Sequence, residues 1–174
     1  MKFEKLTTKK IVILSLFAAI GIILRLIVFY PVPTIKLSVE HVPIILAGLF
    51  FGPLAGAITG FVYDIVGANL IPGGSYFPGI TFSAMLLGVI PALLKPKLIK
   101  SGSFLNIFSI VIITEVIVSM FFNSIWLSML YGISFGTPQF TGLVISRIIT
   151  YLIMSIVYTI IIYFLYNRLK KQLG

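Results

Sequence analysis

The sequence predicts an all-α membrane protein, a single domain over residues 1–174 with six transmembrane helices. Hydrophobic residues make up 59% of the chain and charged residues only 10%, and the mean hydropathy is +1.17. Soluble domains carry about 25% charged residues, so most of this surface must face lipid. At about 20 residues per span, six spans leave only short loops, which excludes a separate soluble catalytic domain.

The basic residues indicate how the chain is oriented in the bilayer. The net charge is +9, and ten of the thirteen basic residues fall into three clusters, namely Lys2, Lys5, Lys9 and Lys10, then Lys95, Lys97 and Lys100, then Arg168, Lys170 and Lys171. Cytoplasmic loops are enriched in Lys and Arg, and an even number of spans puts all three clusters on one side. We therefore expect a prokaryotic plasma-membrane protein with both termini cytoplasmic, and no nucleic-acid partner.

The first two spans are predicted at 11–30 and 37–51. The first is interrupted only by Arg25 and ends before two prolines, Pro31 and Pro33, which cannot continue a helix. A signal peptide is the alternative for this run, but no clear small-residue cleavage site follows it. The second run is strongly apolar only from Val42, so the span must begin near residue 37, or be tilted or partly irregular. Residues 34–41 form an outside loop.

The other spans follow from apolar runs between turn residues. Phe51-Gly-Pro53 is a tight inside turn, and residues 71–79 and 131–139 are polar or glycine-rich outside loops. Lys36 is the only basic residue in the predicted outside loops. The remaining spans are predicted at 54–70, 80–94, 104–130 and 140–166.

Four charged residues lie inside the predicted spans: Arg25, Asp64, Glu115 and Arg147. At a rise of about 1.5 Å per residue, all four fall between the midplane and the outer third of the bilayer. Charges in lipid are costly and face a bundle interior or a cavity. Structural salt bridges are one interpretation for the two acids. For the two arginines we favour binding of an anionic solute from outside, because a guanidinium binds a carboxylate with two hydrogen bonds.

Aromatic residues gather at the same level of the bilayer. One interpretation is an interfacial belt. However, Glu115, Ser119, Asn123 and Trp126 share one helix face, and Arg147, Tyr151, Met154 and Tyr158 share another. Such stripes are unfavourable in lipid and should face inward, where they would form an outward-opening pocket for a flat, aromatic, negatively charged molecule.

Small residues recur at every fourth position of the third span: Gly52, Gly56, Gly60 and Ala68, with Asp64 in the same series. This spacing allows helices to pack closely in membranes. The packing would carry Asp64 into the bundle rather than into lipid.

Several classes of chemistry are excluded or disfavoured. The chain has no cysteine and one histidine, which leaves no metal cluster and no cofactor to expect. It has no GxxxxGK[ST] phosphate loop. His41, beside Glu40, lies outside any nucleophile motif, and we interpret it as a polar interfacial residue, with a ligand contact as the alternative. Binding or transport is favoured over catalysis, although a carboxylate-based membrane enzyme is not formally excluded.

One family shares these features together with a specific motif. The stretch Pro43-Ile-Ile-Leu-Ala-Gly-Leu-Phe-Phe-Gly-Pro-Leu-Ala-Gly56, then Asp64, then Gly74-Ser-Tyr-Phe-Pro-Gly-Ile-Thr-Phe-Ser-Ala84 and Gly88 resembles the substrate-binding S components of energy-coupling factor (ECF) vitamin transporters. The resemblance covers nearly the whole chain and is closest to the folate-specific branch, FolT. Tyr76-Phe-Pro-Gly79 carries most of it.

The resemblance implies a non-catalytic subunit that binds folate from outside, coupled to a membrane-embedded T component and two ABC ATPases. In the family an Ala-xxx-Ala motif on the first helix contacts the T component, and Ser15 and Ala19 occupy that place here. The alternatives are an S component for thiamine, riboflavin or pantothenate, and a small autonomous transporter.

Folate also suits the expected pocket. Aromatic walls would hold the pterin and aminobenzoyl rings, a carboxylate such as Asp64, with Glu40 as the second choice, would accept the pterin N–H groups, and cations would bind the glutamyl carboxylates. The predicted substrate-binding residues are Arg25, Lys36, Glu40, His41, Asp64, Tyr76, Phe77, Phe82, Asn123, Trp126, Tyr131, Arg147 and Tyr151.

Overall fold

Six helical segments form the molecule, as the composition predicted. The computed structural model describes residues 7–27, 29–32, 35–70, 76–98 and 103–173. The all-α class with six transmembrane helices is confirmed, with one short hairpin added to it. The segments are α1 (Thr8–Leu26), α2 (Val42–Phe51), α3 (Pro53–Leu70), α4 (Pro78–Leu98), the continuous run of α5 (Phe104–Glu115), η1 (Val116–Phe122) and α6 (Asn123–Tyr131), and α7 (Pro138–Leu173).

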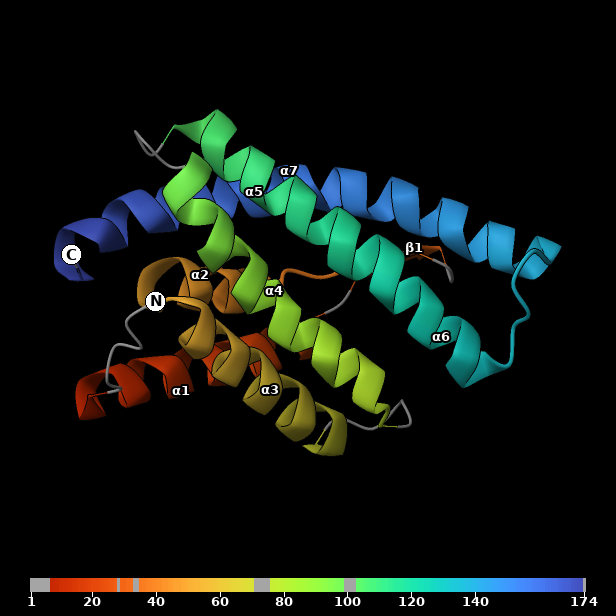
Figure 1. The fold of residues 1–174 in the computed structure, drawn as a ribbon, viewed down its shortest axis with the longest axis horizontal. Helices are drawn as coiled ribbons and strands as arrows, with labels where there is room; N and C mark the ends of the chain where they lie inside the picture. Colours follow the sequence, from red (N-terminus) through yellow and green to blue (C-terminus); the bar gives the residue numbers. More distant parts are fainter. Residues whose placement is uncertain (1–6, 28, 33–34, 71–75, 99–102, 174) are drawn as a thin grey trace.

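Successive helices run in opposite directions along one long axis (Figure 1). The start of α1, the end of α4, the start of α5 and the end of α7 all lie at one end of the bundle. That end carries the described members of the basic clusters, because they occupy the first turn of α1 and the last turns of α4 and α7. Within the described residues, three helical stretches are long and apolar enough to cross a membrane on length and composition alone: Pro78–Leu98, Phe104–Tyr131 and Pro138–Lys170.

The second helix is shorter than expected and need not cross the bilayer alone. α2 begins at Val42 rather than near residue 37 and has 10 residues, which give a length of about 15 Å. Eight of its residues are buried. Because α2 is surrounded by protein, the chain before it can be irregular without exposing backbone groups to lipid.

A β-hairpin replaces much of the loop expected over residues 34–41. β1 (Phe29–Val32) pairs with β2 (Ile35–Leu37) in an antiparallel ladder in which Phe29 lies opposite Leu37. The first helix therefore ends at Leu26 instead of near residue 30. The Tyr158 hydroxyl of α7 donates a 2.7 Å hydrogen bond to the Ser38 carbonyl, which ties the chain after the hairpin to the last helix.

Glycines bring α2, α3 and α4 into backbone contact. A Cβ added to Gly48 would lie 2.0 Å from the Gly88 carbonyl oxygen, and one added to Gly56 would lie 2.5 Å from the same atom. Gly60 packs equally closely on Ala84. The predicted packing stripe is therefore present at Gly56 and Gly60. Gly52 does not belong to it, because it ends α2 with a φ of 90° and a Cβ added there would have no neighbour within 4 Å.

The fifth span contains a π-helix, η1, of seven residues. A π-helix closes its hydrogen bonds from residue i to i+5 and is rare. Its turn holds more residues than an α-turn, so the side chains after it are rotated relative to those before it. The 3.6-residue spacing that put Glu115, Ser119, Asn123 and Trp126 on one face consequently does not hold across this stretch.

Candidate functional site

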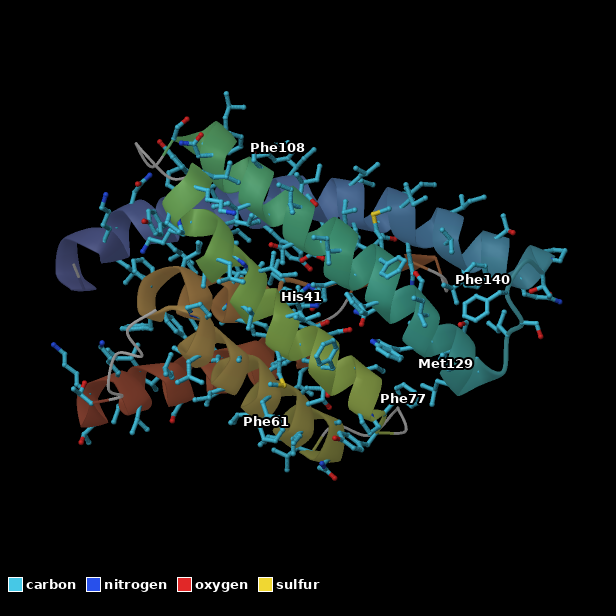
Figure 2. The ribbon with its side chains drawn as sticks, in the orientation of Figure 1. His41, Phe61, Phe77, Phe108, Met129 and Phe140 are labelled. Atoms are coloured by element: carbon cyan, nitrogen blue, oxygen red, sulfur yellow. The ribbon has the colours of Figure 1, made fainter. Side chains whose placement is uncertain are left out.

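A cavity of about 300 Å³ lies between the helices, in the half of the bundle away from the basic end. Helices α1, α3, α4, α6 and α7 contribute to its wall, and the chain just before α2 adds Glu40 and His41. Figure 2 shows His41 in the interior of the bundle, whereas Phe77 lies where α4 begins. The lining residues are Arg25, Glu40, His41, Tyr63, Asp64, Ile80, Ser83, Ala84, Leu87, Asn123, Leu127, Tyr131, Arg147 and Tyr151.

Asp64 of α3 is held by two partners on one wall of the cavity. Its Oδ1 lies 3.3 Å from Arg25 Nη1, and its Oδ2 accepts a 2.7 Å hydrogen bond from the Thr81 hydroxyl of α4. The Arg25 guanidinium also lies over the Tyr63 ring, 5.5 Å from its centroid. Asp64 is only 3% exposed, so the ion pair neutralises both charges in a site where an isolated charge would be costly.

His41 and Glu115 form a second buried pair. His41 Nδ1 lies 3.1 Å from Glu115 Oε1, and the imidazole packs on Tyr158 with ring centroids 5.7 Å apart. The interpretation of His41 as an interfacial residue is wrong, because it is buried at the start of α2. The reason is that Glu115 offers a buried acceptor from across the bundle, which compensates for the loss of water.

Arg147 has a different kind of partner. Its Nη1 donates a 3.0 Å hydrogen bond to the backbone carbonyl of Ser119 in η1, and its guanidinium lies 5.9 Å from the centre of the Tyr151 ring. Among the residues that the structure describes, no carboxylate pairs with it. Arg147 therefore brings a positive charge to the cavity wall that Asp64 and Glu115 do not neutralise.

Two polar groups of the cavity wall have unused hydrogen-bonding capacity. Ser83 Oγ and Asn123 Oδ1 are buried, and neither has a hydrogen-bond partner within the described part of the chain. Buried polar atoms are nearly always bonded. A ligand in the cavity could therefore form hydrogen bonds with these two groups.

Comparison with known proteins identifies the family. A sequence profile described as "ECF transporter, substrate-specific component" matches residues 9–169. The chain belongs to this family of S components. The folate transporter FolT of Leuconostoc mesenteroides is 33% identical, over 95% of this chain and 89% of the relative. FolT of Clostridium novyi is 32% identical, over 75% and 72%.

A solved structure of the same family has the same fold. The crystal structure of FolT bound with folic acid superposes on this S component with a TM-score of 0.79 and 27% sequence identity, covering 93% of this chain and 95% of that one. The similarity extends over nearly the whole bundle, so the arrangement of helices around the cavity is that of the family.

Eight of the predicted substrate-binding residues line the cavity of this S component, and four do not. The side chain of Lys36 lies outside the described residues. The aromatic residues Tyr76, Phe77, Phe82 and Trp126 are absent from the cavity wall. Those that line it are Arg25, Glu40, His41, Asp64, Asn123, Tyr131, Arg147 and Tyr151.

Three of these aromatic residues, Phe77, Phe82 and Trp126, form an aromatic cluster with Phe122. Trp126 stacks on Phe122 with centroids 6.3 Å apart and contacts Phe77 at 6.1 Å. Phe82 meets Phe122 edge to face at 5.9 Å and is 46% exposed, and Tyr76 is 47% exposed. Within α6, Asn123, Leu127 and Tyr131 face the cavity at four-residue spacing, so Trp126 lies beside that face and packs against the start of α4. Their exposure is compatible with the alternative interpretation for Tyr76 and Phe82, an interfacial aromatic belt.

Six lining residues were not predicted: Tyr63, Ile80, Ser83, Ala84, Leu87 and Leu127. The four on α4 recur at spacings of three, one and three residues, which is the pattern of a single helix face. That pattern begins inside the motif that carries the family resemblance and would have identified them. Leu127 lies four residues from both Asn123 and Tyr131, so the same pattern would have identified it, whereas Tyr63 carries no comparable signal.

The predicted coupling residues lie on the outside of the bundle. Ser15 and Ala19 are exposed on α1, and the Ser15 hydroxyl bonds back to the Ile11 carbonyl at 3.0 Å. Their face of this S component is otherwise apolar, with Leu16 and Ile23 each 57% exposed. The face is accessible to lipid or to another helix.

Proposed function

We propose that this S component binds folate from outside the cell for ATP-driven uptake. The observation that carries the proposal is the cavity itself. It is enclosed by the bundle and lined by Arg147, whose charge no described carboxylate neutralises, together with buried hydrogen-bonding groups and tyrosine rings. Folate is flat, aromatic and negatively charged, and both relatives and the superposed structure carry folate or folic acid in their names.

The charges of the cavity support a division of roles along the ligand. Arg25 is neutralised by Asp64 at 3.3 Å, whereas Arg147 is held by a neutral carbonyl. The glutamyl carboxylates would therefore bind Arg147, because a guanidinium offers several N–H donors in one plane. Lys36 would add a second cation, since the residue lies on the hairpin strand β2.

The pterin would be recognised by acceptor groups on the other walls. Asn123 Oδ1 has no partner among the described residues, and Asp64 and Glu40 bring carboxylate oxygens to the same cavity. These oxygens would accept the adjacent N–H donors of the pterin edge. The rings of Tyr63 and Tyr151 would pack on its face.

The remaining parts of the transport reaction are assigned to partners. The sequence has no GxxxxGK[ST] loop, so ATP hydrolysis would belong to two ABC ATPases, with a T component joining them to the exposed face of Ser15 and Ala19. Both termini would be cytoplasmic, because Lys9, Lys95 and Arg168 lie at the same end of the bundle.

Binding of radiolabelled vitamins to the purified chain tests the proposal. Folate, thiamine and riboflavin are each titrated against protein in detergent or nanodiscs, with empty nanodiscs as the control. Saturable folate binding below micromolar concentration, in excess over the other two vitamins, is the expected result. Tighter binding of thiamine or riboflavin would replace folate with that vitamin, and no binding of any of them would contradict the assignment.

A further inference from the structure

The π-helix η1 lies between residues that face the cavity or hold it together. Glu115, immediately before it, holds His41, and Asn123, immediately after it, lines the cavity. Well under 1% of residues in globular proteins adopt this conformation, and π-turns are frequent at functional sites. The presence of a π-helix in the fifth span therefore requires an explanation of its own.

The hydrogen bonds of η1 release one backbone carbonyl toward the cavity. The Asn123 N–H bonds to the Val118 carbonyl, five residues back. In an α-helix it would bond four residues back, to Ser119. The Ser119 carbonyl instead accepts the hydrogen bond from Arg147 Nη1 at 3.0 Å. The π register thus supplies the acceptor that fixes the arginine.

An arginine held by a backbone carbonyl keeps its net positive charge, whereas one held by a carboxylate does not. Asp64 holds Arg25 but also cancels its charge. Ser119 holds Arg147 through a neutral group, so the guanidinium is fixed in position and keeps its full positive charge. A guanidinium has five N–H donors, and one bond to Ser119 leaves the others available.

We propose that η1 is a positioning element that aims Arg147 at the carboxylates of the ligand and so determines specificity for a carboxylate-bearing vitamin. The inference rests on the proposed function for the identity of the ligand. It assigns to the backbone of Ser119 a role in which no side chain of η1 need touch the ligand.

Deletion of one residue from η1 tests this role. Ile117 is 37% exposed on the outside of the bundle, and without it the Asn123 N–H regains Ser119 as its α-helical acceptor. We expect the deletion to weaken folate binding by at least about tenfold, the effect of losing a hydrogen bond to a charged group. Binding of a pterin analogue without the glutamate should change little. Ile113→Ala, which removes an equally exposed side chain from α5, should change neither.

The same deletion in an Arg147→Gln background separates positioning from general damage. If η1 acts through Arg147, the deletion has no further effect on folate affinity in that background. Equal losses for the two ligands, additive losses in the double variant, or no loss would each overturn the inference. Failure of the unaltered chain to bind folate would overturn the proposed function instead.

Arg147→Lys provides an independent test if the deletion variant does not fold, as judged by size exclusion and thermal unfolding. An ammonium lacks the planar fork and cannot hold the carbonyl and a carboxylate in the same way. Folate binding about tenfold weaker than in the unaltered chain is expected, with binding of the glutamate-free analogue retained. Unchanged folate affinity would overturn the inference.

Discussion

The packing of three helices at Gly88 leads to a quantitative prediction about stability. In Gly88→Ala the new Cβ would lie 2.4 Å from the backbone carbon and oxygen of Gly56, where ordinary contacts begin at 3.4 Å. Both neighbours are backbone, so α3 and α4 must separate by about 1 Å, a forced rearrangement that typically costs about 1–3 kcal/mol. The higher helix propensity of alanine returns at most about 1 kcal/mol.

Gly142→Ala is the matched control for this substitution. Gly142 lies in α7, and nothing lies within 4 Å of the position of its added Cβ. Alanine there should leave stability unchanged or raise it by up to about 1 kcal/mol. Reversible unfolding of the purified protein in mixed micelles measures both variants.

The predicted order is Gly88→Ala least stable and Gly142→Ala at least as stable as the unaltered chain. Because Ala84 and Leu87 of α4 line the cavity, separation of the helices should also weaken folate binding in Gly88→Ala. Equal stability of the two variants would refute the reasoning that backbone contact at Gly88 holds α2, α3 and α4 together.

Three further predictions concern single side chains. Thr81→Val removes the 2.7 Å hydrogen bond to Asp64 and should lower the free energy of unfolding by about 1–3 kcal/mol. The loss should be smaller in Thr59→Val, because the Thr59 hydroxyl bonds only to a carbonyl of its own helix. Equal losses in the two variants would contradict this prediction. Arg147→Gln should weaken folate binding about 10- to 100-fold but a glutamate-free pterin much less, and parallel losses would indicate a structural role. Ala19→Trp should abolish uptake in cells while leaving binding by the isolated chain intact, and lost binding would place Ala19 in packing within the chain.

The number of helices and the placement of their charges were predictable because they follow from solvation. An apolar run between Lys clusters has few structures open to it in lipid, and charges such as Asp64 and Arg147 are stable only in the interior. The length of α2 was not predictable in the same way. Its apolar run is short for a span, and only the packing of its neighbours shows that it is buried on nearly all sides.

One feature of the site that the sequence did not show is the π-helix. Its residues, Val116–Phe122, read VIVSMFF, an apolar run that fits an α-helix equally well. In α6, which follows it, Asn123, Leu127 and Tyr131 line the cavity at four-residue spacing, and Trp126, three residues after Asn123, lies outside that face. Arg147 lies on α7, and its charge together with the helix face that it shares with Tyr151 predicted its place on the cavity wall.

A structure of this chain with folate bound tests the central claim most directly. Folate should occupy the cavity between α1, α3, α4, α6 and α7, with its glutamyl carboxylates on Arg147 and its pterin beside Asn123. Folate bound outside this cavity, or inside it with the glutamyl group away from Arg147 and the Ser119–Arg147 bond broken, would contradict the account.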